Sequence, residues 1–174
     1  MKKSFAFILF LLLFLSLPVL AQEKKFNRVV FDEKANINIL LGYCTRDSLE
    51  RGLFSSYFHP EYDNYAEDPV CDAALQKELS GDITITLVMG TWCSDSREQV
   101  PRFYRILDNA GFSSDKVTLI CVNKEKKGGD VSLEELNIEK VPTFIIYRKG
   151  NEAGRIVETP AESLEKDLIL ILGK

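Results

Sequence analysis

The feature that most constrains the fold of this chain is a pair of buried-strand patterns separated by an amphipathic helix. Residues 83–90 (ITITLVMG) and 116–123 (KVTLICVN) are apolar, β-branched runs of strand length. The segment between them carries apolar side chains at helical spacing: Val100, Phe103, Tyr104, Ile106 and Leu107. A strand, a helix and a second strand in this order predict a crossover unit with parallel strands.

The C-terminal part of the chain continues this alternation. Residues 131–138 (VSLEELNI) predict a short helix, and residues 143–158 predict a hairpin of two strands. Thr159 is the expected N-cap of a last helix, with Pro160 at the first helical position and Glu162 completing a capping box. The order of elements predicts an α/β fold with a central mixed sheet and helices on both faces.

The N-terminus has the pattern of a secretory signal peptide. Lys2 and Lys3 precede an apolar run over residues 5–17, and the small residues Val19 and Ala21 follow at the spacing of a cleavage site. We expect cleavage after Ala21 and a mature protein that is periplasmic or secreted, with no membrane contact. The alternative is a retained anchor, but the run is shorter than the roughly 20 residues that a spanning helix needs.

Removal of the signal peptide leaves enough chain for one domain with its own core. We expect residues 1–21 to be the signal peptide, 22–80 an N-terminal extension packed on the core, and 81–174 the main α/β domain. Loss of Lys2 and Lys3 lowers the 22 basic residues to 20, against 26 acidic ones, for a net charge of −6. This charge would repel a phosphate backbone, so nucleic acid is not an expected partner.

The N-terminal extension contains two cysteines. We expect it to hold a strand (NINILLGY), an aromatic loop at residues 56–65 (SYFHPEYDNY) and a helix that begins at Asp68. In an oxidising compartment Cys44 and Cys71 could form a structural disulfide. Two separate free thiols, or a resolving role toward a reactive cysteine elsewhere in the chain, are the alternatives that the sequence leaves open.

One further cysteine has the context of a reactive site. Cys93 follows Trp92 after the first buried strand and stands at the expected start of the helix, among polar neighbours. Unpaired backbone N–H groups and the positive end of the helix dipole favour a thiolate at such a position. Ser96, one turn along, can offer its hydroxyl to the sulfur. Cys121, in contrast, lies within the second buried strand, where a structural role explains it.

The motif TWCSDS after a buried strand, a proline inside the following helix, and VPTFIIY further along occur together and in this order. With the hairpin and the amphipathic last helix, they make residues 80–174 similar to the thioredoxin superfamily. The resemblance implies a thioredoxin-like fold with Cys93 as the active-site cysteine and a cis peptide bond before Pro142. It also implies that Val141, Pro142 and Thr143 border a groove that binds an extended substrate segment.

The chain departs from the family pattern at three positions. Ser96 replaces the second cysteine of a redox dithiol. Leu87 stands where many thioredoxins hold a buried acid that assists that cysteine, and without the second thiol such an acid would only cost desolvation energy. Glu158 stands where a glycine commonly borders the substrate groove. It is either a groove residue that favours cationic substrates or a solvated side chain.

These residues predict thiol–disulfide exchange, of the isomerase or reductase type, through one cysteine. The Cys93 thiolate can form mixed disulfides with proteins or small thiols. Ser96 cannot release them, so release must come from the substrate's own thiol, a small thiol or another protein. The alternative is a non-catalytic binding module that holds a partner in the groove. We expect no cofactor and no metal, because no metal-ligand spacing and no phosphate-binding loop occurs.

Overall fold

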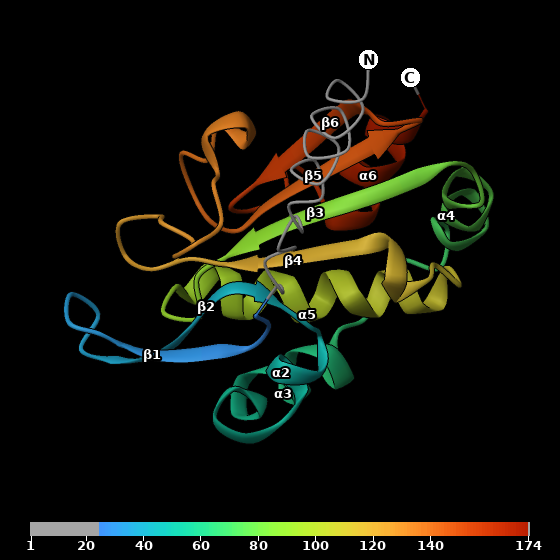
Figure 1. Cartoon of the computed structure of the whole chain (residues 1–174). Helices are drawn as coiled ribbons and strands as arrows, with labels where there is room; N and C mark the ends of the chain where they lie inside the picture. Colours follow the sequence, from blue (N-terminus) through green and yellow to red (C-terminus); the bar gives the residue numbers. More distant parts are fainter. Residues whose placement is uncertain (1–24, 174) are drawn as a thin grey trace, which may run out of the picture.

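The computed structural model describes residues 25–173, which fold around one six-stranded mixed sheet (Figure 1). The strands lie in the order β1-β2-β4-β3-β5-β6. Their bounds are β1 Arg28–Asp32, β2 Ile37–Cys44, β3 Ile83–Met89, β4 Val117–Cys121, β5 Thr143–Arg148 and β6 Asn151–Val157. The expected signal peptide and its cleavage point lie outside the described residues. None of the helices between residues 25 and 173 is long and apolar enough to cross a membrane.

Four α-helices of two turns or more accompany the sheet in the described part of the chain: α3 Ser55–Asn64, α4 Asp72–Leu79, α5 Ser94–Asn109 and α6 Leu164–Leu172. The shorter elements are the single-turn helix α2 Asp47–Glu50 and the 3-10 helices η1 Gly52–Phe54, η2 Ser114–Lys116 and η3 Glu134–Leu136. The last of these lies in the segment where the sequence predicts a short helix.

The predicted crossover unit forms the centre of the sheet. β3 and β4 are parallel, in a register that places Met89 opposite Cys121, and α5 connects them. Most side chains of β3 are buried, and they alternate between the two faces, as a strand in the middle of a sheet requires. α5 buries an apolar stripe that includes Val100, Phe103 and Ile106.

The outer strands are added by two antiparallel ribbons. β5 pairs with β3, and β6 pairs with β5 at one edge, which confirms the predicted hairpin. Lys149 and Gly150 turn the chain between them with positive φ values of 52° and 77°. At the other edge β2 joins β4, and β1 is the outermost strand. The N-terminal extension therefore continues the sheet of the main domain.

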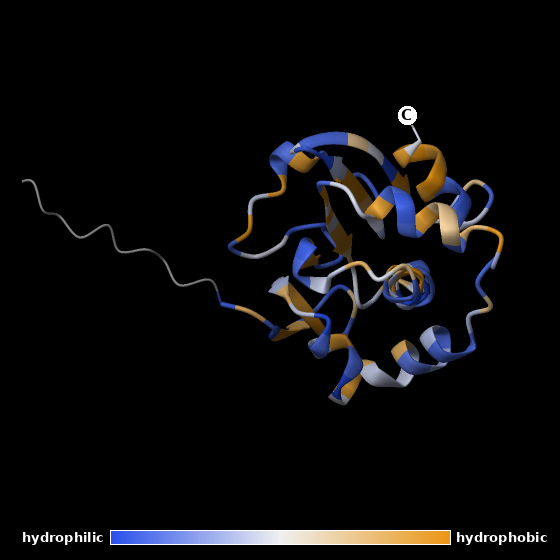
Figure 2. Cartoon of the chain, turned by 90° about the vertical axis from the view of Figure 1, so that its right-hand side faces the viewer, coloured by the Kyte–Doolittle hydropathy of each residue, from blue (hydrophilic) through white to orange (hydrophobic). Residues whose placement is uncertain are grey.

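The two faces of the sheet are covered unequally. The larger core lies between the sheet and the α-helices, and it contains Phe58 of α3, Leu75 of α4, Phe103 of α5 and Leu168 of α6. Figure 2 shows α5 nearly end-on between α6 and α3, with all three on one side of the sheet. Most of the buried apolar surface that stabilises the fold lies in this layer.

The opposite face of the sheet carries a smaller core of four buried side chains, Val88, Ile120, Val122 and Val141. It lies under the segment between β4 and β5, whose one helix is the 3-10 helix η3. We expected helices on both faces of the sheet, and on this face the only helix between β4 and β5 is the single 3-10 turn η3. Residues 124–130 (KEKKGGD) are polar and contain two glycines, which disfavours a longer helix. Trp92 and Cys93 pack against this smaller core.

The aromatic segment at residues 56–65 is a helix, so the prediction of a loop is wrong. α3 contains Pro60, although a proline inside a helix removes one backbone hydrogen bond. Phe58 is 1% exposed, and its ring stacks on that of Tyr62 one turn later, with 5.8 Å between the ring centroids. Phe58 also contacts Tyr104 of α5. Packing of these rings against α5 outweighs the local effect of the proline.

The last helix begins later than the sequence indicates. α6 starts at Leu164, and its N-cap is Ser163, whose hydroxyl accepts the N–H of Lys166 at 3.2 Å. The predicted capping box from Thr159 to Glu162 is therefore wrong. The Asp167 carboxylate accepts the backbone N–H groups of residues 161 and 162, which holds them in a turn ahead of the helix.

Candidate active site

Cys93 stands where strand β3 passes into helix α5. It is the N-cap of α5, with an extended backbone (φ −89°, ψ 130°), and its carbonyl accepts the N–H of Arg97 at 3.1 Å. The start of a helix leaves several backbone N–H groups without a helical partner, and these point toward the cap. Cys93 is partly exposed, whereas the other three cysteines are buried. It is therefore the cysteine that a substrate in solution can reach most directly.

The Cys93 sulfur lies against the segment that leads into β5. Sγ donates a hydrogen bond to the Val141 carbonyl at 3.3 Å, and the peptide bond between Val141 and Pro142 is cis. Both residues are buried. Thr143 is also buried, and its hydroxyl donates to the Lys140 carbonyl at 2.7 Å. Thr143 therefore stabilises the turn that carries Val141 and Pro142.

Ser96 lies fully buried beneath the first turn of α5. The sequence suggests that its hydroxyl approaches the Cys93 sulfur, but the hydrogen bond that the structure contains is to the backbone. The Ser96 hydroxyl accepts the N–H of Gly90 at 3.3 Å. Ser96 thus joins the helix start to the end of β3, and it stabilises the position of Cys93 through the backbone.

Trp92 packs beside the thiol on the side of β4. Its Nε1 donates to the Val122 carbonyl at 2.9 Å, and the Lys124 ammonium lies 5.0 Å from the ring centroid, a cation–π distance. Gly90 makes room for the ring, because a Cβ at this position would lie 2.5 Å from Cε2 of Trp92. Sequence reasoning missed Lys124, since a lysine in a polar loop carries no signal that distinguishes it from its neighbours.

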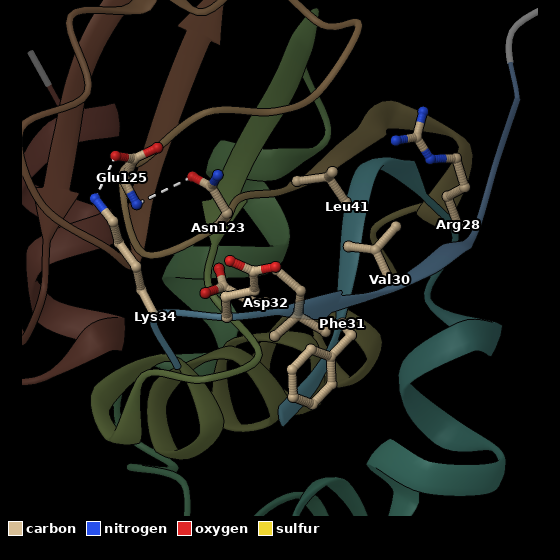
Figure 3. Close-up of a pocket in the computed structure, with 10 residues that line it drawn as sticks. Arg28, Val30, Phe31, Asp32, Lys34, Leu41, Asn123 and Glu125 are labelled. Carbon is tan, nitrogen blue, oxygen red and sulfur yellow. Dashed lines mark hydrogen bonds and ion pairs between the residues drawn. The ribbon is translucent and has the colours of Figure 1, made fainter. Parts of the chain in front are cut away.

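The β1–β2 hairpin fixes the loop that carries Lys124. The Asp32 carboxylate accepts the N–H of Lys124 at 3.0 Å. Burial raises the pKa of Asp32, but hydrogen bonds from Lys124 and from its own turn lower it more, so this pKa lies below its usual range. Figure 3 shows Asp32 beside a cavity of about 370 Å³. There Lys34 forms an ion pair with Glu125, and Asn123 accepts the Glu125 N–H.

An ion pair borders the other side of Val141. Lys140 Nζ lies 2.6 Å from a carboxylate oxygen of Glu158. Glu158 has a φ of 61°, in the left-handed region that favours glycine, and its N–H donates to the Pro142 carbonyl at 2.7 Å. Glu158 therefore lies beside the cis proline and Lys140. Its charge is partly neutralised by Lys140.

Arg97 places a positive charge near the start of α5, beside Thr91 and Tyr57. Its Nε donates to the Thr91 carbonyl at 2.7 Å, and its guanidinium lies 5.4 Å from the ring centroid of Tyr57. Every other arginine between residues 25 and 173 takes part in an ion pair with a carboxylate, and Arg97 does not.

The remaining cysteines lie apart from Cys93. Cys44 and Cys71 are free thiols, so the disulfide between them that the sequence left open is not formed. Cys71 precedes α4, which packs on α6 at one side of the molecule, whereas Cys44 ends β2 at the other side and neighbours Cys121. Within the described residues, no three His, Cys, Asp or Glu side chains gather in a way that could hold a metal ion.

The arrangement of these elements defines the class of protein. A parallel β3-α5-β4 crossover is followed by the antiparallel β5-β6 hairpin and a terminal helix, with a cysteine at the start of α5 beside a cis proline. This is the thioredoxin-like fold. The resemblance to the thioredoxin superfamily that the sequence suggested is confirmed at the level of the fold.

Solved structures of thioredoxins align with part of this chain. A thioredoxin from Malassezia sympodialis is 21% identical, with a TM-score of 0.37, over 56% of this chain and 83% of its own. A thioredoxin from Fasciola hepatica is 17% identical, with a TM-score of 0.37, over 58% and 88%. The protein Trxlp from Edwardsiella tarda is 22% identical, with a TM-score of 0.38, over 58% and 92%. No protein-family model and no curated protein matches the sequence. Similarities at this level carry no information on activity or substrate.

Proposed function

We propose that the protein catalyses thiol–disulfide exchange with Cys93 as its nucleophile. The observation that carries this proposal is the position of Cys93, a partly exposed thiol at the N-terminus of a 16-residue helix, with its sulfur 3.3 Å from the Val141 carbonyl. The helix start favours a negative charge. The thiolate is the form of cysteine that attacks disulfides.

In the first step the Cys93 thiolate attacks one sulfur of a substrate disulfide. A bond forms between the Cys93 sulfur and that sulfur, the substrate S–S bond breaks, and the second substrate sulfur leaves as a thiolate. Ionisation of Cys93 also breaks the hydrogen bond that its thiol donates to the Val141 carbonyl. This carbonyl is then free to accept an N–H from an extended substrate segment.

The second step needs a thiol from outside this site. Ser96 is buried, is bonded to the Gly90 backbone and has no sulfur, so it cannot release the mixed disulfide. Attack by a different thiol of the substrate gives isomerisation. Attack by a small thiol or by a thiol of another protein on the Cys93 sulfur releases the reduced substrate and leaves a new mixed disulfide on Cys93, which a second such thiol reduces. The substrates in this proposal are disulfide-containing proteins or small thiols, and the compartment is the periplasm or the cell exterior, where disulfides persist.

A second candidate function is a non-catalytic binding module. The resting Cys93 thiol donates a hydrogen bond to Val141, and ionisation would forfeit it. In a binding module the thiol would stay protonated, and the groove beside Val141 would hold a partner without exchange. Replacement of Cys93 by serine would then leave partner binding intact.

Reaction with oxidised glutathione, followed by intact-mass analysis and peptide mapping, separates the two functions. We expect Cys93 to form a mixed disulfide at neutral pH faster than free cysteine does under the same conditions, and the adduct to persist until a small thiol is added. Cys93→Ser should abolish this adduct, and Cys71→Ser, the matched control at a buried cysteine, should retain it. Absence of a Cys93 adduct, or a rate below that of free cysteine, refutes the catalytic function.

A further inference from the structure

Two buried thiols meet between strands β2 and β4. In the antiparallel register of these strands Gly42 lies opposite Cys121 and Cys44 lies opposite Leu119, so the two cysteines occupy neighbouring positions on one face of the sheet. Both belong to the larger core, where the Cys44 thiol donates a hydrogen bond at 3.5 Å to the carbonyl of Gly42, the residue opposite Cys121. Neither forms a disulfide in the structure.

A cavity of about 500 Å³ leads to one of these thiols. Cys44 lines it together with apolar and charged side chains, among them Phe26, Arg46 and Tyr104. Cys121 does not line this cavity and is 0% exposed, against 4% for Cys44. The pair therefore presents one thiol to the cavity and keeps the other behind it.

The surroundings also make the two thiols unequal as acids. The neighbouring Cys121 side chain lowers the pKa of Cys44, although burial opposes this shift. Burial raises the pKa of Cys121 well above its usual value. Cys44 is therefore the thiol that ionises first, with Cys121 as the neutral partner that stabilises it. A reactive thiol in front and a protonated one behind is the arrangement of nucleophile and resolving thiol in a redox dithiol.

We propose that Cys44 and Cys121 form a second thiol–disulfide site, which takes small aliphatic disulfides and is separate from Cys93. Cys44 attacks one sulfur of a disulfide in the cavity, which gives a mixed disulfide and releases one small thiol. Cys121 then attacks the Cys44 sulfur, the mixed disulfide breaks, and the second small thiol leaves as the Cys44–Cys121 bond forms. The protein pair is oxidised by two electrons, and the small disulfide is reduced to its two thiols.

This pair has a capacity that Cys93 lacks. Ser96 prevents Cys93 from closing an internal disulfide, so Cys93 alone can only exchange one disulfide for another. The Cys44–Cys121 pair can supply both electrons that reduce a disulfide, because its two thiols can form a disulfide within one chain. The two sites also lie in different cores, because Cys93 packs against the smaller core and the pair belongs to the larger one. Reaction at one site is therefore expected without reaction at the other.

The test uses the full chain with Cys93→Ser, which removes the other site, and 2-hydroxyethyl disulfide as the probe. After incubation under native conditions, excess probe is removed, and all free thiols are alkylated in denaturant and located by peptide mapping. Cys71 is a matched internal control, since it is buried to 6% exposure but has no thiol neighbour in this arrangement. We expect a Cys44–Cys121 disulfide and an alkylated Cys71.

Two variants in the same background separate the roles. Cys121→Ala should trap a stable mercaptoethanol adduct on Cys44, and Cys44→Ala should leave Cys121 fully alkylated. If either core variant fails to fold, mapping of the Cys93→Ser protein decides alone. Recovery of alkylated Cys44 and Cys121 from that protein, oxidation that requires prior unfolding in urea, or a disulfide to Cys71 overturns the proposal. Because Cys93 is absent from every sample, the outcome is independent of the function proposed for it.

Discussion

Replacement of Gly90 by alanine should destabilise the Cys93 site, because the added methyl group has no room. It would lie 2.5, 2.6 and 2.9 Å from Cε2, Nε1 and Cζ2 of Trp92, where non-bonded carbon atoms normally keep about 3.5–4.0 Å. The ring must then shift by about 1 Å. Such a shift lengthens the hydrogen bond from Trp92 to the Val122 carbonyl and displaces the ring from the Lys124 ammonium.

The expected cost follows from these contacts. Overpacking of a close-packed site costs about 1–3 kcal/mol. Loss of a hydrogen bond costs about 1 kcal/mol, and weakening of an exposed cation–π contact costs about 0.5 kcal/mol. Because relaxation of the ring relieves part of the overpacking while it weakens the other contacts, we expect the free energy of unfolding of Gly90→Ala to fall by about 2–4 kcal/mol in total.

Urea unfolding followed by circular dichroism measures this loss, and fluorescence reports its cause. Trp92 is the one tryptophan of the chain, so its emission reports directly on the ring. Gly81→Ala is a matched control, because a Cβ there would lie 3.8 Å from its nearest neighbour, the Glu78 carbonyl oxygen. It should change the free energy of unfolding by less than about 0.5 kcal/mol. If Gly90→Ala unfolds at the same urea concentration as the parent and its emission is unchanged, the packing argument is wrong.

Three further substitutions test other parts of the site. Ser96→Cys supplies a resolving thiol and loses the hydrogen bond from the Gly90 N–H, at a cost of about 1 kcal/mol. The rate of insulin reduction with dithiothreitol should rise above that of the parent. An unchanged rate would contradict the role given to Ser96. Asp32→Asn should lower the melting temperature at pH 7. Folding lowers the pKa of Asp32, so its carboxylate stabilises the fold at pH values above its unfolded pKa of about 3.9. This contribution is lost as the pH falls through the pKa of the folded state. The melting temperatures of the parent and the variant should therefore converge in acid. Glu158→Gly should raise the melting temperature, because it relieves about 1 kcal/mol of strain at a left-handed non-glycine residue and loses only a partly exposed ion pair with Lys140. A fall in melting temperature would show that the ion pair contributes more than the backbone strain costs.

The central crossover and the hairpin could be predicted because each of their strands is an uninterrupted apolar run of ordinary length. Helix α3 could not, because Pro60 among polar neighbours is a loop signal, and the helix depends on the packing of Phe58 against α5. Strand β1 has only three apolar residues and becomes a strand through pairing with β2. Thr159 and Ser163 are both plausible N-caps of the last helix from sequence. The structure selects Ser163, because the Asp167 carboxylate holds the backbone of residue 161 in a turn before the helix.

At the candidate site, the resemblance was enough to predict that Cys93 and Val141 lie together, and Trp92 packs with them against the smaller core. The partners that hold them come from elsewhere. Lys124 reaches Trp92 because its own loop is anchored by the first strand, and no local pattern encodes that contact. The meeting of Cys44 with Cys121 depends on the register of β2 on β4, which a single sequence does not reveal.

The unequal cover of the two sheet faces determines how the molecule loosens. Cys93 and Trp92 rest on four buried side chains under one connecting segment, while four helices clamp the larger core. Regions with fewer buried contacts open at lower free energy than the whole molecule. Amide protons around residues 122–142 should therefore exchange with solvent sooner than those of β3 and α5. The end of the molecule that carries Cys93 can therefore open locally while β3 and α5 stay folded, and amide exchange measures this opening separately from global unfolding.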